Sequence, residues 1–458
     1  MEMSRLSKIN YFLICVCVIV TTLIYGTVHQ PVIALFYLAV ALMVILWASD
    51  CLLSGTMRIS RERLQVPLYA AAVYGFIQVI PFGSIIETAG VSDIPRTISV
   101  EPFSTQTTAI HYLALCFFFS VVLVYLDSAA RLRKVVSVVT IFGFAFAFFA
   151  ILQSVLSPNK IYGIYEVTFA QPFGSFVSRH NFAAYMEMAV SLPLGMMFVG
   201  AVRRDKKLLY TTAIILMGAA LLLSGSRGGL VSLLAEIILL IILTTGRKGP
   251  KTLILKAGLA AALFAAVIGG AIFVGGDTSL TRVAETAVSQ DVTTDRMHIW
   301  AVTVKVIAAN LPFGAGFGAF AQGYTPFDTY SGLARVEQAH NDYLQVLADA
   351  GVVGLGIGLL FLYWFFRTGL LNASCSNVFR RGIATGAFAG CCAILVHSMF
   401  DFVLHTTAIS ILFLTLLAMM SSSGGEYADD IAEFDDEHSR HRRATRTRKD
   451  RDKTKHLP

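Results

Sequence analysis

The sequence predicts an all-α, multi-pass membrane protein with about twelve membrane-spanning helices. Of its 458 residues, 56% are hydrophobic and only 14% are charged, and the mean hydropathy of +0.68 lies well above the range of soluble domains. The apolar residues gather into runs of the length that crosses a hydrocarbon core of ~30 Å. The basic residues between these runs alternate in number from one side to the other, as in multi-pass membrane proteins.

Twelve apolar runs are candidates for these helices. They lie near residues 9–25, 31–48, 65–80, 109–126, 135–156, 181–201, 208–223, 228–244, 253–275, 342–366, 382–402 and 405–420. Several are short, and only His405 and its neighbours separate the last two, so we expect ten to twelve spans. The first run follows Arg5 and Lys8 as in a signal sequence. No small-residue cleavage site precedes Pro31, so we interpret this run as a retained helix.

The distribution of Lys and Arg predicts the orientation, because basic residues accumulate in cytoplasmic loops. With both termini inside and twelve spans, 28 of the 36 basic residues fall on the cytoplasmic side. The others fall outside: Arg96, Lys160, Arg179, Arg227, Arg282, Arg296, Lys305 and Arg335. All seven cysteines lie in spans or inside, so no extracytoplasmic disulfide framework is expected. The charge of +7 is spread over inner loops, which argues against a nucleic-acid partner.

Two segments outside the spans complete the predicted organisation. A large extracytoplasmic loop, 276–339, contains an amphipathic stretch, 279–290, and a helix beginning at Asp295. Residues 421–458 carry an acidic block followed by a basic one with almost no apolar residues, which predicts a disordered cytoplasmic tail. Residues 1–420 form the membrane domain, and membrane lipids are the expected partners of its surface.

The segment from Gln338 to Gly358 places polar residues at the start of a predicted span that contains several glycines. At ~100° per residue, Asp342 and Asp349 point away from His340. The residues that share one helical face with His340 are Leu347, Gly351, Gly354 and Gly358. This predicts that His340 lies at the end of a helix face of small residues, against which another helix packs closely. Imidazole titrates near ambient pH and serves as a general base; capping of the helix is the alternative interpretation.

A second candidate is Arg227, the only charged residue in the short turn from Ser224 to Leu230. Its flanking glycines let phosphate oxygens approach backbone and guanidinium together. Contact with lipid phosphates at the membrane surface is the alternative. The glycine-rich stretch 312–320 superficially resembles a nucleotide-binding loop, but no buried strand precedes it and it is expected on the outer side.

Four motifs together resemble the O-antigen ligase and O-antigen polymerase superfamily. They are Ser-Arg-Gly-Gly at 226–229, Arg-x-x-Ile-Trp at 296–300, Pro-Phe-Gly-x-Gly at 312–316, and His340-Asn341 followed after nine residues by Gly351-x-x-Gly354. The resemblance is strongest over residues 173–401. It implies a glycosyltransferase that passes a glycan from undecaprenyl diphosphate to an acceptor hydroxyl at the periplasmic face of the bacterial inner membrane.

The resemblance also implies the substrates. Ligases of this kind use lipid A-core as the acceptor, and polymerases use a growing lipid-linked glycan; both alternatives remain open. The donor brings its own diphosphate leaving group, so no cofactor is expected, and the ligases are metal-independent. Attack opposite the diphosphate would invert the anomeric carbon. A transporter is the more distant alternative, because Glu187, Glu236 and Asp349 lie in predicted spans, where carboxylates are functional candidates.

Six residues receive roles from the resemblance. Arg227 and Arg296 would stabilise the departing diphosphate, because guanidinium stays protonated and binds phosphate oxygens in pairs, and His340 would accept the proton of the hydroxyl. The residues expected to contact substrate or to orient these three are Arg179, Asn341 and Asp401.

One further pattern surrounds Asp401. His397, Asp401 and His405 recur at i, i+4 and i+8, a spacing that is compatible with a metal triad on one helical face. Hydrogen bonding of each residue to its neighbours is the interpretation we prefer, with Asp401 orienting His340 or an arginine.

Overall fold

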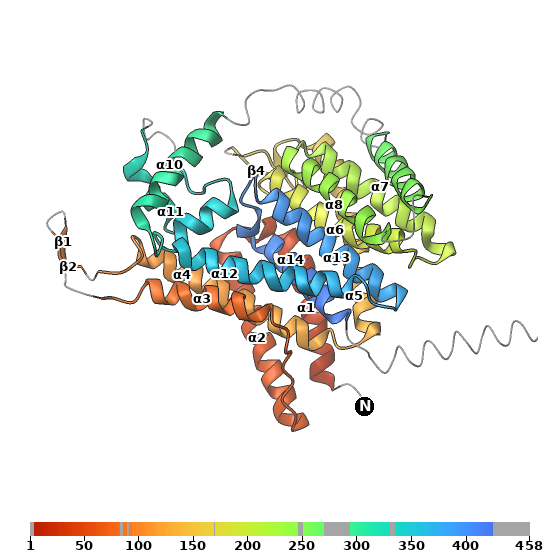
Figure 1. Ribbon diagram of the computed structural model, residues 1–458, viewed down its shortest axis with the longest axis horizontal. Helices are drawn as coiled ribbons and strands as arrows, with labels where there is room; N and C mark the ends of the chain where they lie inside the picture. Colours follow the sequence, from red (N-terminus) through yellow and green to blue (C-terminus); the bar gives the residue numbers. More distant parts are fainter. Residues whose placement is uncertain are drawn as a thin grey trace, which may run out of the picture.

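The computed structural model describes residues 4–82, 86–88, 91–94, 96–168, 170–245, 251–269, 294–329 and 335–424. The predicted amphipathic stretch 279–290 and the tail from residue 425 onwards lie outside these residues. The described part is almost entirely helical, and the helices pack side by side into one bundle (Figure 1). The short helices of the large loop gather at one end of this bundle.

The helices follow the chain order of the predicted spans. They are α1 (Arg5–Leu23), η1 (Tyr25–Thr27), α2 (Gln30–Ser54), α3 (Gln65–Gln78), α4 (Pro102–Tyr125), α5 (Ala129–Leu156), α6 (Arg179–Val199), η2 (Arg204–Lys206), α7 (Lys207–Leu223), α8 (Arg227–Thr245), a helix over Lys251–Gly269, α10 (Thr294–Asn310), α11 (Phe320–Tyr324), η4 (Thr325–Phe327), α12 (Asp342–Asn372), α13 (Val378–His397), η5 (Val403–His405) and α14 (Thr407–Ser422). Two antiparallel hairpins interrupt them, β1 (Ile86–Thr88) with β2 (Val91–Ile94) and β3 (Lys160–Ile161) with β4 (Tyr165–Glu166).

The predicted fold class is confirmed. Each of the twelve apolar runs overlaps a helix within the described residues, and ten helices there are long and apolar enough to cross a membrane. α14 is apolar but shorter. The loop also carries the expected short helices, and α10 ends at Asn310, before Pro312, because proline offers no N–H to continue a helix.

The centre of the bundle is the contact between α6 and α13. In the most apolar stretch of α6, 89% of the residues are buried, against 17% in α2, so α6 lies in the middle and α2 at the edge. Gly195 and Gly386 let the two backbones touch, since a Cβ on Gly195 would overlap the backbone of Gly386. Lipid is as apolar as the side chains, so close packing of this kind holds such helices together.

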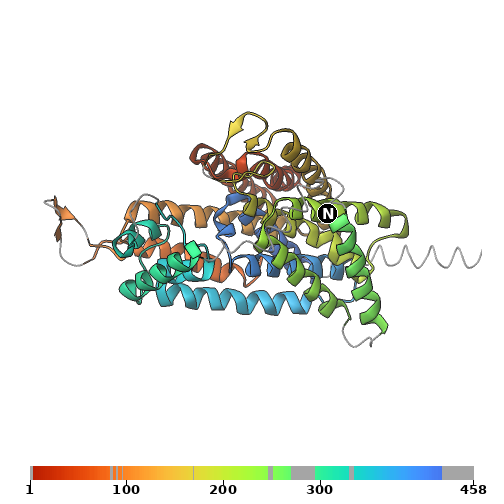
Figure 2. The same cartoon turned by 90° about the horizontal axis from the view of Figure 1, so that it is seen from above.

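α12 runs along one edge of the molecule (Figure 2). Its helical geometry is interrupted at Gly351. Gly351 has φ 57° and ψ −146°, a conformation that residues with a Cβ avoid. A Cβ here would overlap the carbonyl oxygen of Pro312, which accepts a hydrogen bond of 2.9 Å from the N–H of Val352. The predicted helical face with His340 is therefore wrong. His340 precedes the helix, and Gly351 accommodates the glycine-rich turn of the loop rather than another helix.

Candidate functional site

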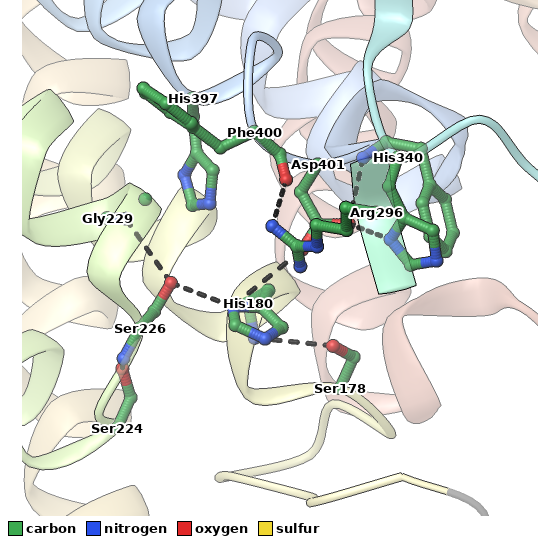
Figure 3. A network of polar contacts seen from close by, with 12 residues as sticks. Ser178, His180, Ser224, Ser226, Gly229, Arg296, His340, His397, Phe400 and Asp401 are labelled. Atoms are coloured by element: carbon green, nitrogen blue, oxygen red, sulfur yellow. Dashed lines mark hydrogen bonds and ion pairs between the residues drawn. The ribbon is translucent and has the colours of Figure 1, made fainter. Parts of the chain in front are cut away.

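A cavity of about 740 Å³ lies where the first turns of α6, α8 and α10 meet the link between α13 and η5. Its ionisable lining residues, among those that the structure describes, are Lys160, Arg179, Arg227, Arg296, His180, His340, His397 and Asp401. Four permanent cations and one carboxylate make the cavity electropositive, which suits an anionic ligand. Figure 3 shows the polar contacts at its centre. Five of the six predicted site residues line this cavity, and Asn341 does not.

His340 and Asp401 form a hydrogen-bonded pair within the cavity. Nδ1 of His340 lies 3.2 Å from Oδ1 of Asp401, and the ring meets Phe402 edge-on, with centroids 4.8 Å apart. A carboxylate opposite Nδ1 places the proton on that nitrogen, so Nε2 becomes the basic one. His340 has φ 50°, an uncommon backbone conformation that often occurs at functional sites. About a third of its side chain (33%) is exposed, which leaves it accessible from the cavity.

Asn341 holds His340 in place instead of lining the cavity. Its Oδ1 accepts hydrogen bonds from two backbone N–H groups in the first turn of α12, as an N-cap does. Its Nδ2 donates to the carbonyl oxygen of Met399 at 3.1 Å. Its predicted contact with substrate stays a prediction. Asn341 joins the segment that carries His340 to the segment that carries Asp401.

α10 binds the same two segments through its Arg-x-x-Ile-Trp motif. Nε1 of Trp300 donates to the carbonyl oxygen of Ala339 at 3.0 Å, one residue before His340. Four residues earlier, and so on the same helical face, Arg296 donates to the carbonyl oxygen of Phe400 and lies 3.5 Å from Oδ2 of Asp401. The motif therefore fixes His340 and Arg296 relative to each other.

Asp401 is the electrostatic centre of the site. Its side chain is 8% exposed, and Oδ2 also lies 3.7 Å from Nδ1 of His180. Burial alone would raise the pKa of Asp401. The hydrogen bond from His340 and the charges of His180 and Arg296 outweigh burial and hold the pKa of this carboxyl well below its ordinary value. Asp401 is therefore expected to carry its negative charge near neutral pH.

The opposite wall of the cavity is built by the first turns of α6 and α8. Arg179 and Arg227 are the first residues of these helices, where the backbone dipole is positive. Gly225, with φ 68°, turns the chain between α7 and α8, and the guanidinium of Arg179 packs against it. Oγ of Ser226 accepts from the N–H of Gly229 at 3.2 Å and lies 2.9 Å from Nδ1 of His180, which ties α8 to α6.

His397, Asp401 and His405 do not share a helical face, because α13 ends at His397. Nδ1 of His397 lies 3.2 Å from both carboxylate oxygens of Glu187, and Nδ1 of His405 lies 3.3 Å from Asp342. The described residues contain no group of three His, Cys, Asp or Glu that would hold a metal ion. The metal-triad interpretation is wrong, and each residue pairs with a neighbour instead.

The intramembrane carboxylates have different surroundings. Glu187 pairs with His397, and Asp349 accepts from Nε2 of Gln345 at 3.1 Å. Glu236 is fully buried, and its two carboxylate oxygens have no hydrogen-bond partner within the described ranges.

The fold and the site together define a class: a multi-pass helical membrane protein with an electropositive cavity that contains a histidine–aspartate pair. Residues 212–359 match the model of the family described as O-Antigen ligase, so this part of the chain is similar to that family. The match supports an O-antigen ligase-related superfamily and an O-antigen ligase- or polymerase-type function in surface polysaccharide biosynthesis. Arg227, Arg296 and His340 lie inside the matched range, whereas Arg179 and Asp401 lie outside it. No curated protein matches the chain.

Proposed function

We propose that the protein transfers a glycan from undecaprenyl diphosphate to an acceptor hydroxyl, as a metal-independent, inverting glycosyltransferase of the O-antigen ligase type. The observation that carries this proposal is the meeting of the His340–Asp401 pair and three arginines in one cavity. A transfer from a diphosphate donor needs these two elements. One removes a proton from the acceptor, and the other stabilises the charge of the leaving group.

The donor half of the reaction belongs to the arginines. As the bond between the anomeric carbon and the diphosphate breaks, the electron pair goes to the phosphate oxygen, and negative charge builds there. Arg227 and Arg179 begin two helices at the cavity wall, so guanidinium and helix dipole act on the same region. These fixed positive charges supply the stabilisation that a metal ion supplies in other phosphate chemistry.

The acceptor half belongs to His340. Its Nε2 takes the proton of the acceptor hydroxyl while the hydroxyl oxygen forms the bond to the anomeric carbon. Asp401 accepts the hydrogen bond from Nδ1 and stabilises the imidazolium that results. Attack from the side opposite the diphosphate inverts the configuration of that carbon.

The cavity faces the periplasm in this proposal, and both termini are cytoplasmic. The distribution of Lys and Arg supports this orientation, since the cavity arginines belong to the few basic residues on the predicted outer side. Ligation and polymerisation share the donor half of the reaction and differ in the acceptor. Glycan joined to lipid A-core identifies a ligase, whereas a longer lipid-linked glycan identifies a polymerase.

A complementation assay tests the proposal. Arg227→Ala, Arg296→Ala and His340→Ala should each abolish attachment of glycan at the cell surface while membrane insertion and the lipid-linked precursor persist. Arg203→Ala is the matched control, because Arg203 is exposed and pairs with Asp205 in the link between α6 and α7. Full activity in all three cavity variants would overturn the mechanism. Accumulation of precursor on the cytoplasmic face alone would favour a flippase.

A further inference from the structure

The second nitrogen of His397 has no role in the mechanism above. His397 is the last residue of α13 and lines the cavity, yet its side chain is completely buried. The carboxylate of Glu187 pairs with Nδ1 of this ring. Nε2 is buried and makes no hydrogen bond to any residue that the structure describes. Burying a nitrogen without a hydrogen bond costs free energy, unless a ligand or a water molecule supplies that bond.

Nε2 of His397 is directed at the first turn of α8. A Cβ on Gly228 would lie 2.8 Å from both Nε2 and Cδ2, so only glycine leaves room for the ring at this position. Gly228 follows Arg227, and both line the cavity. Figure 3 shows the ring of His397 hanging from the end of α13 toward the side where His180 and Arg296 lie. A buried imidazole nitrogen thus lies against the N-terminus of a 19-residue helix, at a point where both elements line the cavity.

We infer that His397 and the first turn of α8 form an anion subsite that binds one phosphate of a diphosphate ligand, with Nε2 of His397 as a hydrogen-bond donor. The N-terminus of a long helix attracts phosphate through its dipole and its N–H groups. A histidine with a carboxylate at Nδ1 and a phosphate at Nε2 donates at both nitrogens. Glu187 is then a positioning residue that sets the ring angle.

The ligand assignment rests on the proposed function, which supplies a diphosphate at this cavity. The same chemistry would also bind inorganic diphosphate, so both are used as probes. Binding is measured on the full-length protein in lipid nanodiscs with undecaprenyl diphosphate and with inorganic diphosphate. His397-dependent binding of either probe supports the subsite, and the tighter of the two identifies the source of the anion.

The variants separate the two nitrogens of the ring. His397→Asn keeps an N–H near the position of Nδ1, toward Glu187, and removes the donor toward α8. It should weaken binding on the order of 10- to 100-fold, the value of a hydrogen bond to a charged group. Glu187→Gln combined with His397→Gln places an amide near the position of Nε2 and removes the buried charge, so it should retain more affinity than His397→Asn. His405→Asn, at another histidine–carboxylate pair, which does not line this cavity, should bind as the wild type does.

Two results would overturn the subsite: wild-type affinity in a folded His397→Asn protein, or no measurable binding of either probe to the wild type. Failure of the proposed function looks different. If the wild type binds diphosphate through His397 but forms no glycan product, the reaction is wrong and the subsite stands. If the wild type forms product while His397→Asn binds normally, the subsite is wrong and the reaction stands.

Discussion

Replacing Asp401 by asparagine tests the centre of the site while keeping its shape. Oδ1 of the carboxylate lies 3.2 Å from Nδ1 of His340, and Oδ2 lies 3.5 Å from the guanidinium of Arg296. An amide has one oxygen and one NH₂ group, so whichever way it turns, one of these two donors meets another donor. A hydrogen bond to a charged group contributes about 1.5–3 kcal/mol, and a general base contributes about 10²- to 10⁴-fold to the rate. We therefore expect Asp401→Asn to slow transfer by about 10²- to 10⁴-fold.

The assay is the initial rate of glycan transfer from a defined donor by purified protein in nanodiscs, at saturating donor. Asp342→Asn is the matched control, since Asp342 pairs with His405 and does not line the cavity. The pKa of Asp401 is held below the ordinary aspartate value of roughly 4. The ionised Asp401 therefore stabilises the folded protein above that pH, and this contribution is lost as the pH falls toward the folded pKa. The difference in melting temperature between wild type and Asp401→Asn should accordingly shrink in acid. A rate for Asp401→Asn within a few-fold of wild type would refute the role of the pair.

Three further outcomes follow from the structure. Gly351→Ala should lower the free energy of unfolding by roughly 1–3 kcal/mol from backbone strain alone, and the overlap of the new Cβ with Pro312 should lower it further. Gly356→Ala is the control and should not lower it, because a Cβ there meets open space. Thermal unfolding in detergent measures both variants. Asn341→Ala should reduce the transfer rate and lower the free energy of unfolding by about 0.5–2 kcal/mol through the lost cap, and a normal rate would show that Asn341 does not position the base. Burial lowers the pKa of His405, but its pairing with Asp342 and the charge of Asp349 together outweigh burial, so the net pKa is raised. This stabilisation is full below roughly pH 6.5 and lost as the pH rises through the folded pKa, so Asp342→Asn should lower the melting temperature more at acidic than at alkaline pH.

The sequence was sufficient for the fold class because membrane spans depend on local hydropathy. Each span satisfies its own backbone hydrogen bonds, so a run of apolar residues predicts a helix without knowledge of its neighbours. The motif residues of the site also came from the sequence, through their resemblance to a family. Arg227, Arg296 and His340 lie far apart in the chain, and the structure brings them to one cavity.

Other parts of the site depend on how helices cross, which no local pattern contains. His180 and Ser226 were not predicted as site residues. Their positions next to Arg179 and Arg227 in the sequence could have indicated them. The hydrogen bond from Asn341 to Met399 was not predicted, because Met399 is distant in sequence. The helical projection of Gly351 failed since the projection assumes an unbroken helix, whereas the pairing with Pro312 breaks it.

Asp401 joins the two walls of the cavity. On one wall, α10 reaches the chain beside His340 through Trp300 and reaches Asp401 itself through Arg296. On the opposite wall, His180 of α6 lies 3.7 Å from the same carboxylate. Under the proposed mechanism the alignment of His340 therefore depends on both walls at once, so a substitution that shifts either wall should slow transfer even if it leaves the other wall intact.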